Sequence, residues 1–272
     1  MKPFLRWAGS KVQLIPTIKT YWQPQFKRYV EPFCGSAALF FSVQPQWAVL
    51  SDLNSELICT LAQIQIAPDI VSEVLSRMPT DERSYYRVRA QDPAHLSPNE
   101  RAAQFIYLNA LCFNGLYRTN GEGRFNVPYG SKKKSKLFDA LELREASRLL
   151  NNALLEASDF QSIVDRTTLG DFIYLDPPYA TGSKRIFNAY GKDLFTTKDL
   201  IRLTAALDRA DNRGVRFVLS YADVPEIHDF KKKWTTCTVQ ARRNISGFTG
   251  SRRKVNEIIV TNCKGIDMSE ST

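Results

Sequence analysis

With 272 residues the chain can bury a substantial core, and it contains no apolar run near the roughly 18 residues that span a bilayer. Its first residues, MKPFLRWAGSK, lack the uninterrupted apolar segment expected of a secretory signal. Its five cysteines are scattered, odd in number and never in CxxC spacing, which argues against a disulfide framework and a zinc site and predicts a metal-free cytoplasmic protein. Thirty-seven Lys and Arg against 28 Asp and Glu give a net charge of +9, a surplus that favours a polyanionic partner such as nucleic acid.

The N-terminal part has the pattern of a βαβ unit. Residues 28–33 (RYVEPF) and 47–51 (WAVLS) are short and apolar, which is typical of buried strands, and the helical segment AALFFSV lies between them. Two such strands joined by a short helix are the building block of a parallel sheet. We therefore expect a parallel α/β sheet to begin here.

The middle of the chain changes character. From about 54 to 112 the periodicity is helical, with breaks expected near Pro68, Pro79 and Pro98. Residues 114–130, NGLYRTNGEGRFNVPYG, are rich in Gly and Asn and carry aromatic residues at intervals, which predicts a hairpin or an ordered loop. The pattern indicates a mostly helical insertion of roughly 85 residues.

Strand–helix alternation resumes after a helical DALELREASRLLNN. Strands are predicted at 153–158, 171–175 and 215–221, with a helix at about 197–212. The chain closes with WTTCTVQARR and KVNEIIVTN, two long strands linked by a glycine-bearing turn, which predict an antiparallel hairpin at the sheet edge. The sequence therefore predicts a doubly wound α/β core with a helical insertion.

Ligands bind outside the carboxyl ends of the strands in open α/β sheets, and two strand ends here are unusual. In EPFCGS, Gly35 lets the backbone turn tightly against a ligand, and a helix starting near Ser36 offers unpaired N–H groups; an ordinary turn is the alternative. In LSDLN, Asp52 stands where a nucleoside-bearing cofactor finds a carboxylate for its ribose hydroxyls. The alternative is a helix N-cap, which Asp52 or Asn54 could equally provide.

A third strand end reads FIYLDPPY, so that an apolar strand runs directly into an acid, two prolines and a ring. The prolines remove two N–H donors, leaving carbonyls and the Asp176 carboxylate as a cluster of acceptors beside Tyr179. Such a pocket suits a planar group that donates hydrogen bonds from an amino nitrogen, and the exocyclic amine of a nucleobase is the obvious candidate. A proline-stiffened turn is the alternative.

In this order the motifs resemble the Dam-type DNA adenine N6-methyltransferases, the D12 class of the alpha group, over almost the whole chain. NGLYRTNGEGRFNVPYG is similar to the family's DNA-reading hairpin, DPPY to its catalytic signature, and ISGFTGSRRKVNEIIVTN to its closing hairpin. Ser10 replaces a glycine of the family's opening motif, and Ser220-Tyr221 stand where many relatives carry Ser-Asn. The segments similar to its donor motifs are LRWAGSK (5–11), EPFCGSAAL, SDLNSEL and ASDF (157–160).

The resemblance implies a Rossmann-like S-adenosylmethionine-dependent methyltransferase core. Residues 1–53 and 140–272 would form the catalytic domain, and residues 54–139 a helical DNA target-recognition domain. Asp176, Pro177, Pro178 and Tyr179 would receive the target adenine, without a metal or a covalent enzyme intermediate. The residues implied around S-adenosylmethionine are Trp7, Ala8, Gly9, Lys11, Glu31, Phe33, Gly35, Ser36, Asp52, Asp159, Phe160 and Asp176.

Double-stranded DNA is the implied partner, with GATC as the candidate target sequence. Arg118 is expected to read a base in the major groove, with a phosphate contact as the alternative, and Leu116 or Tyr117 to fill the space that a flipped base vacates. Lysines 132 to 134 are expected at phosphates, unless they are a solvated charge run. The implied DNA-contacting residues are Arg6, Asn114, Leu116, Tyr117, Arg118, Asn126, Pro128, Tyr129, Lys132, Lys133 and Lys134.

Two other functions stay open at this stage. An RNA adenine methyltransferase can carry a relative of DPPY, and the NGLYR…FNVPYG segment is the feature against it. A DNA-binding regulator could keep the fold without turnover, and the intact Asp52 and DPPY argue against that. We expect a monomer encoded by a bacterium or a phage; the sequence leaves open whether it partners a restriction nuclease.

Overall fold

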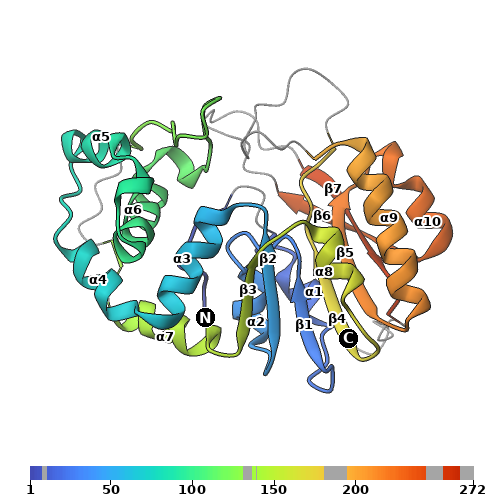
Figure 1. Ribbon diagram of the computed structural model, residues 1–272. Helices are drawn as coiled ribbons and strands as arrows, with labels where there is room; N and C mark the ends of the chain where they lie inside the picture. The colour runs from blue at the N-terminus through green and yellow to red at the C-terminus, as the bar shows by residue number, and fades with distance from the viewer. Residues whose placement is uncertain (8–10, 131–136, 139, 181–194, 243–253, 264–272) are drawn as a thin grey trace.

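The computed structural model describes residues 1–7, 11–130, 137–138, 140–180, 195–242 and 254–263 (Figure 1). Within them seven strands form one sheet in the order β3-β2-β1-β4-β5-β7-β6. Strands β1 to β5 pair in parallel, and β7 pairs antiparallel with both β5 and β6. The predicted α/β core with a C-terminal antiparallel hairpin is confirmed; β7 lies inside the sheet and β6 forms its edge.

The strands follow the sequence prediction to within two residues. The first one ends before Pro32, whose ring nitrogen has no N–H to offer the ladder. Every residue of β4 is buried, as expected of an inner strand that is covered on both faces. The strands are β1 (Arg28–Glu31), β2 (Ala48–Asp52), β3 (Ala153–Ala157), β4 (Asp171–Leu175), β5 (Arg216–Ala222), β6 (Thr235–Arg242) and β7 (Lys254–Thr261).

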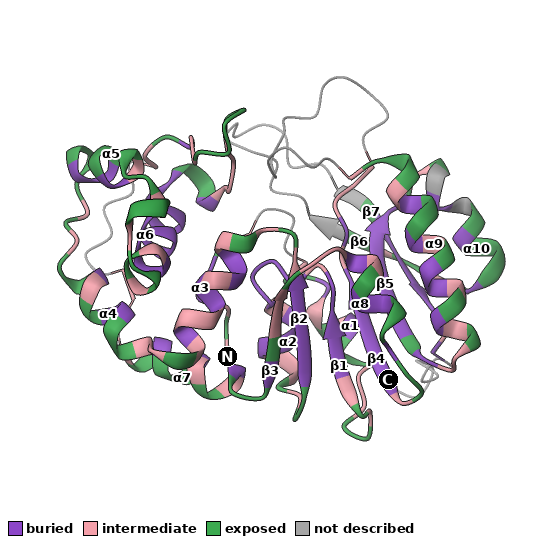
Figure 2. Cartoon of the chain, viewed as in Figure 1, coloured by how far each residue is buried: buried purple, intermediate pink, exposed green. Residues whose placement is uncertain are grey.

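Alternate side chains of the strands pack into two separate apolar clusters, one on each face of the sheet. Tyr29 and Phe172 belong to one cluster, and their neighbours Val30 and Ile173 to the other. Figure 2 shows the central strands as almost wholly buried between the helices. The first cluster includes α1 (Ile15–Lys19) and α2 (Ala38–Val43), and the second α8 (Phe160–Asp165), α9 (Thr197–Asn212) and α10 (His228–Lys233).

The remaining helices lie to one side of the sheet (Figure 1). Pro68 and Pro98 are the first residues of α4 and α6, where the fixed φ suits a helix and the missing N–H costs nothing. A capping box of Ser97 and Glu100 also fixes the start of α6. These helices are α3 (Ser55–Ile66), α4 (Pro68–Ser76), α5 (Glu82–Ala90), α6 (Pro98–Leu111) and α7 (Ala140–Leu150).

Helix α3 connects this helical part to the sheet, because it packs against β2 and β3 as well as against α6 and α7. In the part of the chain that the structure describes, no single helix is long and apolar enough to cross a membrane. Among the helices described, the pair α3 and α4, bent by 108° at its break, meets that test of length and composition together.

The segment predicted as a hairpin or an ordered loop forms a loop closed by two antiparallel bridges, Cys112–Tyr129 and Thr119–Phe125, after a 3-10 turn at Phe113–Gly115. At its tip the Asn120 side chain accepts hydrogen bonds from the backbone N–H groups of residues 122 and 124. The Tyr85 hydroxyl of α5 donates to the Val127 carbonyl at 2.8 Å. The loop is therefore held in place by the helical part of the chain.

Candidate active site

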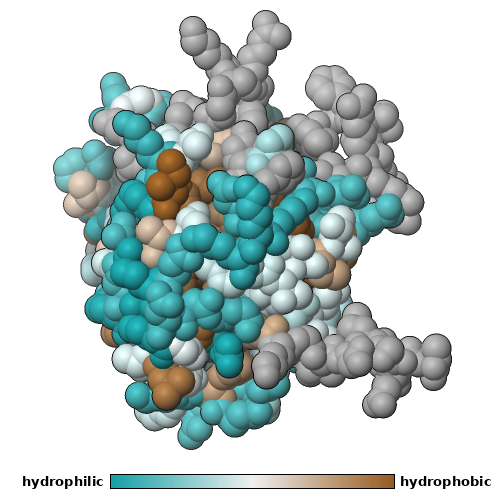
Figure 3. All heavy atoms as spheres, turned by 90° about the vertical axis from the view of Figure 1, so that its right-hand side faces the viewer, coloured by the Kyte–Doolittle hydropathy of each residue, from teal (hydrophilic) through white to brown (hydrophobic). Residues whose placement is uncertain are grey.

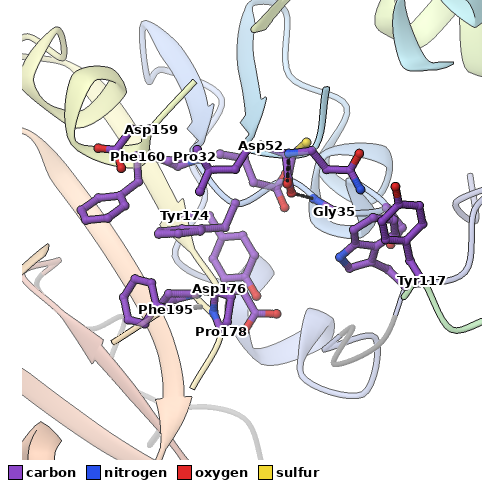
Figure 4. Close-up of a pocket in the computed structure, with 18 of the residues that line it drawn as sticks. Pro32, Gly35, Asp52, Tyr117, Asp159, Phe160, Tyr174, Asp176, Pro178 and Phe195 are labelled. Carbon is purple, nitrogen blue, oxygen red and sulfur yellow. Dashed lines mark hydrogen bonds between the residues drawn. The ribbon is translucent and has the colours of Figure 1, made fainter. Parts of the chain in front are cut away.

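A cavity of about 1010 Å³ lies at the carboxyl ends of β1, β2 and β4 (Figure 4). The strand order reverses between β1 and β4, and this switch point is where doubly wound sheets bind their ligands. Gly35, Asp52 and Asp176 all line the cavity. The structure therefore brings together the three strand ends that the sequence singled out.

The turn after β1 and the acid after β2 are joined by hydrogen bonds. The Asp52 carboxylate accepts from the N–H of Gly35 at 3.1 Å and of Asn54 at 3.0 Å. Gly35 has φ +46°, and a Cβ there would lie 2.6 Å from Cδ1 of Trp7, so both conformation and space require glycine. Asn54 caps α3 through its own side chain, which settles the N-cap alternative and leaves Asp52 facing the cavity.

One end of the cavity is aromatic. The rings of Phe33 and Phe160 stack with centroids 5.3 Å apart, and Phe195 packs against both. Asp159 caps α8 and accepts a hydrogen bond from Arg202 Nη2 at 2.7 Å. The Arg202 guanidinium also lies 4.9 Å from the Phe160 ring centroid. The sequence pointed to Phe33, Asp159 and Phe160 but to neither Phe195 nor Arg202.

The opposite wall is built around Trp7. Its ring stacks on Tyr117 with centroids 5.6 Å apart and an interplanar angle of 19°. Tyr117, expected on the DNA side, therefore lies in the wall of the cavity. Glu31 and Ser36 line the cavity and are buried, and burial raises the pKa of Glu31 well above its usual range although a hydrogen bond from Tyr29 opposes this.

Asp176 stands directly after β4. Its Oδ1 accepts a hydrogen bond from Ser220 Oγ at 3.2 Å and lies 3.7 Å from Lys11 Nζ. Burial raises the pKa of Asp176, the positive charge of Lys11 opposes that rise, and the negative charge of Glu257 adds to it, so that the pKa is about 6. Pro177 and Pro178 line the cavity beside it.

A buried ionic cluster adjoins Asp176. The Lys11 ammonium donates to the Tyr179 hydroxyl and lies 3.2 Å from Glu257 Oε2, while the Tyr179 hydroxyl donates to Glu257 Oε1 at 2.9 Å. Burial lowers the pKa of Lys11, but the negative charges of Asp176 and Glu257 and the contact with the Tyr179 hydroxyl outweigh this and raise it above its ordinary value. The sequence named Lys11 and Tyr179 but not Glu257, whose only signal is an acid inside an apolar strand.

The Tyr179 ring has a second support at the position where the sequence departs from the family pattern. The edge of Tyr221 packs against it, with ring centroids 5.2 Å apart at 78°. The Tyr221 hydroxyl also accepts the backbone N–H of Ala180 at 2.6 Å. Tyr221 therefore supports the DPPY segment from β5.

The residues expected to contact DNA gather near the bridged loop. Arg6 is exposed and tied to α6, because its N–H donates to the Asn109 side chain at 2.9 Å and its carbonyl accepts from that side chain at 2.8 Å. Arg118 Nε donates to Asn126 Oδ1 at 2.7 Å, which orients the guanidinium. Asn114, in the left-handed region with φ 56°, is exposed.

Other expected contacts are placed differently. Pro128 is exposed, and Leu116 is partly buried against the core. The Tyr129 hydroxyl donates to the Thr80 carbonyl at 2.8 Å, and the Tyr129 ring packs on Tyr85. Tyr129 is thus anchored to the helical part. Some residues named from the sequence lie outside the residues that the structure describes: Ala8, Gly9, Ser10, Lys132, Lys133 and Lys134.

A strand-end acid and a glycine turn at the switch point of a doubly wound sheet define a nucleotide-binding class of α/β protein. The chain belongs to the D12 class N6 adenine-specific DNA methyltransferases, because the family model with that description matches residues 7–245. A Type II methyltransferase, M1.LlaDCHI of Lactococcus lactis subsp. cremoris, is 35% identical, with 96% of this chain and 95% of the relative covered.

Two further relatives cover the chain almost end to end. The Type II methyltransferase M.MjaIII of Methanocaldococcus jannaschii is 34% identical, with 96% of this chain and 99% of that protein covered. The DNA adenine methylase of Escherichia coli K12 is 30% identical, with 97% of this chain and 96% of that protein covered. Membership of the family makes DNA the substrate and adenine the methylated base.

Proposed function

We propose that this protein transfers a methyl group from S-adenosylmethionine to N6 of an adenine flipped out of double-stranded DNA. The observation that carries the proposal is the acceptor cluster of Asp176 and Pro177 beside the Tyr179 ring, at the mouth of a cavity that also contains Asp52. Its volume, about 1010 Å³, lies at the top of the range for a single small ligand and suits a donor and a base together.

The cavity fits the donor residue by residue. Asp52 suits the ribose hydroxyls, the Phe33 and Phe160 rings suit the faces of the donor's adenine, and Asp159 suits its amino group. Glu31, a buried acid, suits the donor's ammonium group. When bound, S-adenosylmethionine supplies a sulfonium methyl group, whose bonding electron pair stays with sulfur when the methyl leaves.

The DPPY segment is proposed to hold the target base. An adenine amino nitrogen is a poor nucleophile, because its lone pair is delocalised into the ring. Hydrogen bonds from its N–H groups to the Asp176 carboxylate and the Pro177 carbonyl draw the nitrogen towards tetrahedral geometry, and stacking on Tyr179 fixes the ring. As the new N–C bond forms, the nitrogen releases one N–H proton, to the Asp176 carboxylate or to solvent. Attack geometry of this kind can supply ~7–11 kcal/mol of the barrier. An adenine inside the duplex cannot enter the cavity, so the base must be flipped out at a cost of a few kcal/mol.

Recognition of the target sequence is assigned to residues 54–139, and catalysis to residues 1–53 and 140–272, with α3 as the helix that connects them. Arg118, oriented by Asn126, is proposed to bond guanine O6 and N7 in the major groove, with GATC as the candidate site. Lys132, Lys133 and Lys134 are assigned to phosphates. We propose that the protein acts as a monomer in the cytoplasm of a bacterium or in a phage-infected cell.

The substrate class is tested with purified protein and methyl-labelled S-adenosylmethionine. Duplex DNA, single-stranded DNA and structured RNA of matched adenine content are incubated in parallel, and the labelled nucleoside is identified by mass spectrometry. The proposal predicts N6-methyladenine in duplex DNA, with little label in RNA. Label confined to RNA would favour the RNA methyltransferase, and no label in any nucleic acid would favour a regulator without turnover.

A further inference from the structure

Glu257 is a charged residue in the middle of a buried strand. It lies on β7, paired with Ala222 of β5 and Val239 of β6, and only 1% of its surface is exposed. A carboxylate buried to that extent is strongly destabilising unless it is paired and hydrogen-bonded. Its partners therefore show what the fold uses it for.

Two of these partners among the described residues come from segments far away in the sequence. The Tyr179 hydroxyl, after β4, donates to the two carboxylate oxygens at 2.9 and 3.1 Å. The Lys11 ammonium, before α1, lies 3.3 and 3.2 Å from the same two oxygens. Glu257 thus connects the last strand of the chain to the opening segment and to the ring of the DPPY motif.

The Lys11 ammonium lies between two carboxylates and is closer to Glu257. It stands 3.2 Å from Glu257 Oε2 but 3.7 Å from Asp176 Oδ1. A closer pair between Lys11 and Asp176 would use acceptor capacity of the Asp176 carboxylate that is otherwise open to a target amino group. Glu257 competes for the ammonium, so the Asp176 carboxylate remains available at the cavity.

We infer that Glu257 is a positioning residue for methyl transfer, which fixes the phenol of Tyr179 and holds the Lys11 ammonium back from Asp176. The inference rests on the proposed function and adds to it a residue that touches neither the base nor the donor. It accounts for a buried acid on β7 beside the DPPY motif.

The electrostatic consequence is a change in pH dependence. The titratable and polar groups that face Asp176 are Lys11 from the N-terminal segment, Glu31 from β1, Tyr174 from β4, Tyr179, Ser220 from β5 and Glu257 from β7. Among them the Glu257 charge raises the pKa of Asp176 and the Lys11 charge lowers it. Removal of the Glu257 charge therefore moves the pKa of Asp176 downwards.

The test compares wild type with Glu257→Gln, which keeps the size and an acceptor oxygen but removes the charge. We expect kcat to fall by roughly a hundredfold, as for other misplacements of the catalytic groups by about 1 Å, with KM for DNA little changed. The acid limb of kcat/KM moves to lower pH. Glu156→Gln is the matched control and should behave as wild type. Glu156 is also a strand glutamate in an ion pair, 2.6 Å from Arg166, but it lies on β3 at the far edge of the sheet.

Tyr179→Phe provides a second variant, because it keeps the ring and removes the hydroxyl that Glu257 holds. Its effect on kcat should not add to that of Glu257→Gln, since both break the same contact. The inference would be overturned if Glu257→Gln had the kcat of the wild type and the same pH dependence of kcat/KM. It would also be overturned if the kcat loss in Glu257→Gln added to that of Tyr179→Phe while the pH dependence of kcat/KM stayed unchanged. Failure of the wild-type protein to methylate any adenine would instead overturn the proposed function together with it.

Discussion

Asp176 is the residue whose protonation state matters most to the proposed reaction, because the ionised carboxylate is a charged acceptor for the target amino group, whereas the protonated form carries an O–H donor and no negative charge. Burial sets its pKa near 6 in spite of the nearby Lys11 ammonium. An acid with this pKa is largely ionised at pH 7 and largely protonated at pH 5, one pH unit below its pKa. Activity therefore depends on pH in the range where most carboxylates have finished titrating.

We expect kcat/KM to fall with decreasing pH through a midpoint near 6, because protonation removes the acceptor on which the target amino group depends. The measurement is the pH profile of methyl transfer to a short duplex at subsaturating DNA. The unfolding temperature, recorded over the same range, controls for acid denaturation. A profile that stays flat down to pH 5 with folded protein would remove Asp176 ionisation from the mechanism.

At the scale of an element, the turn after β1 depends on one glycine. Gly35→Ala would force a side chain into a left-handed conformation and against Trp7, so the turn must open and the Asp52 hydrogen bond is lost. We expect at least a tenfold loss of donor affinity, about 1.4 kcal/mol, measured by calorimetric titration with S-adenosylhomocysteine. Gly121→Ala is the control, because a Cβ there meets nothing within 4 Å; equal affinities for the two variants would contradict the account.

The bridged loop carries the prediction about target choice. Arg118→Ala should remove about 1–3 kcal/mol of discrimination at one base pair while it leaves nonspecific affinity nearly unchanged. The measurement is methylation of a library of duplexes with single substitutions around the preferred site. Arg124→Ala is the control on the same loop, because Arg124 is exposed at the tip and pairs with Glu122. An unchanged site preference in Arg118→Ala would assign that guanidinium to a phosphate.

The elements differ in how well the sequence predicted them. The seven strands were predicted because β-branched and apolar runs between turn residues are long enough to show a pattern. Helices α1, α8 and α10 were not predicted, because five or six residues, less than two turns, show little helical period. Helix α2 is as short and was predicted because it lies between the two strands of a βαβ unit. Residues 114–130 were predicted as a hairpin or an ordered loop from their Gly, Asn and aromatic residues, but the local pattern did not show the hydrogen bond from Tyr85 of α5 to the Val127 carbonyl.

The residues of the site also differ in how well the sequence predicted them. Gly35, Asp52 and Asp176 were predictable, because the rule for parallel sheets places all such strand ends at one edge. Arg202 lies on the surface of α9 and Glu257 inside β7, and neither follows a strand end. They reach the cavity and its ionic cluster only through tertiary packing, which a local pattern does not encode.

At the scale of the whole molecule, the charge of +9 and the shape of the surface bear on partners. Figure 3 shows the side formed by α9 and α10 as mostly hydrophilic, with apolar residues scattered singly. Apolar residues that are exposed singly are normal on a protein surface and need no partner. Among the described residues, this side of the molecule shows no extended apolar surface.

Salt dependence tests how the positive charge is used. If Lys132, Lys133 and Lys134 all contact phosphates, their joint replacement by Gln should reduce the slope of log Kd against log salt concentration by up to about 2.7, roughly 0.9 for each contact. Binding to a duplex with the preferred site and to one without it should weaken alike. An unchanged slope would make these lysines a solvated charge run.

The central claim is that the DPPY slot receives an adenine of duplex DNA. The most direct measurement is modification-sensitive sequencing of DNA from a methylation-free host that expresses this chain, in parallel with Asp176→Ala. We predict N6-methyladenine at nearly every copy of one short sequence with the wild type, and none with the variant, whose DNA affinity should persist. Marks that persist in Asp176→Ala, or no methyladenine with the wild type, would contradict the account.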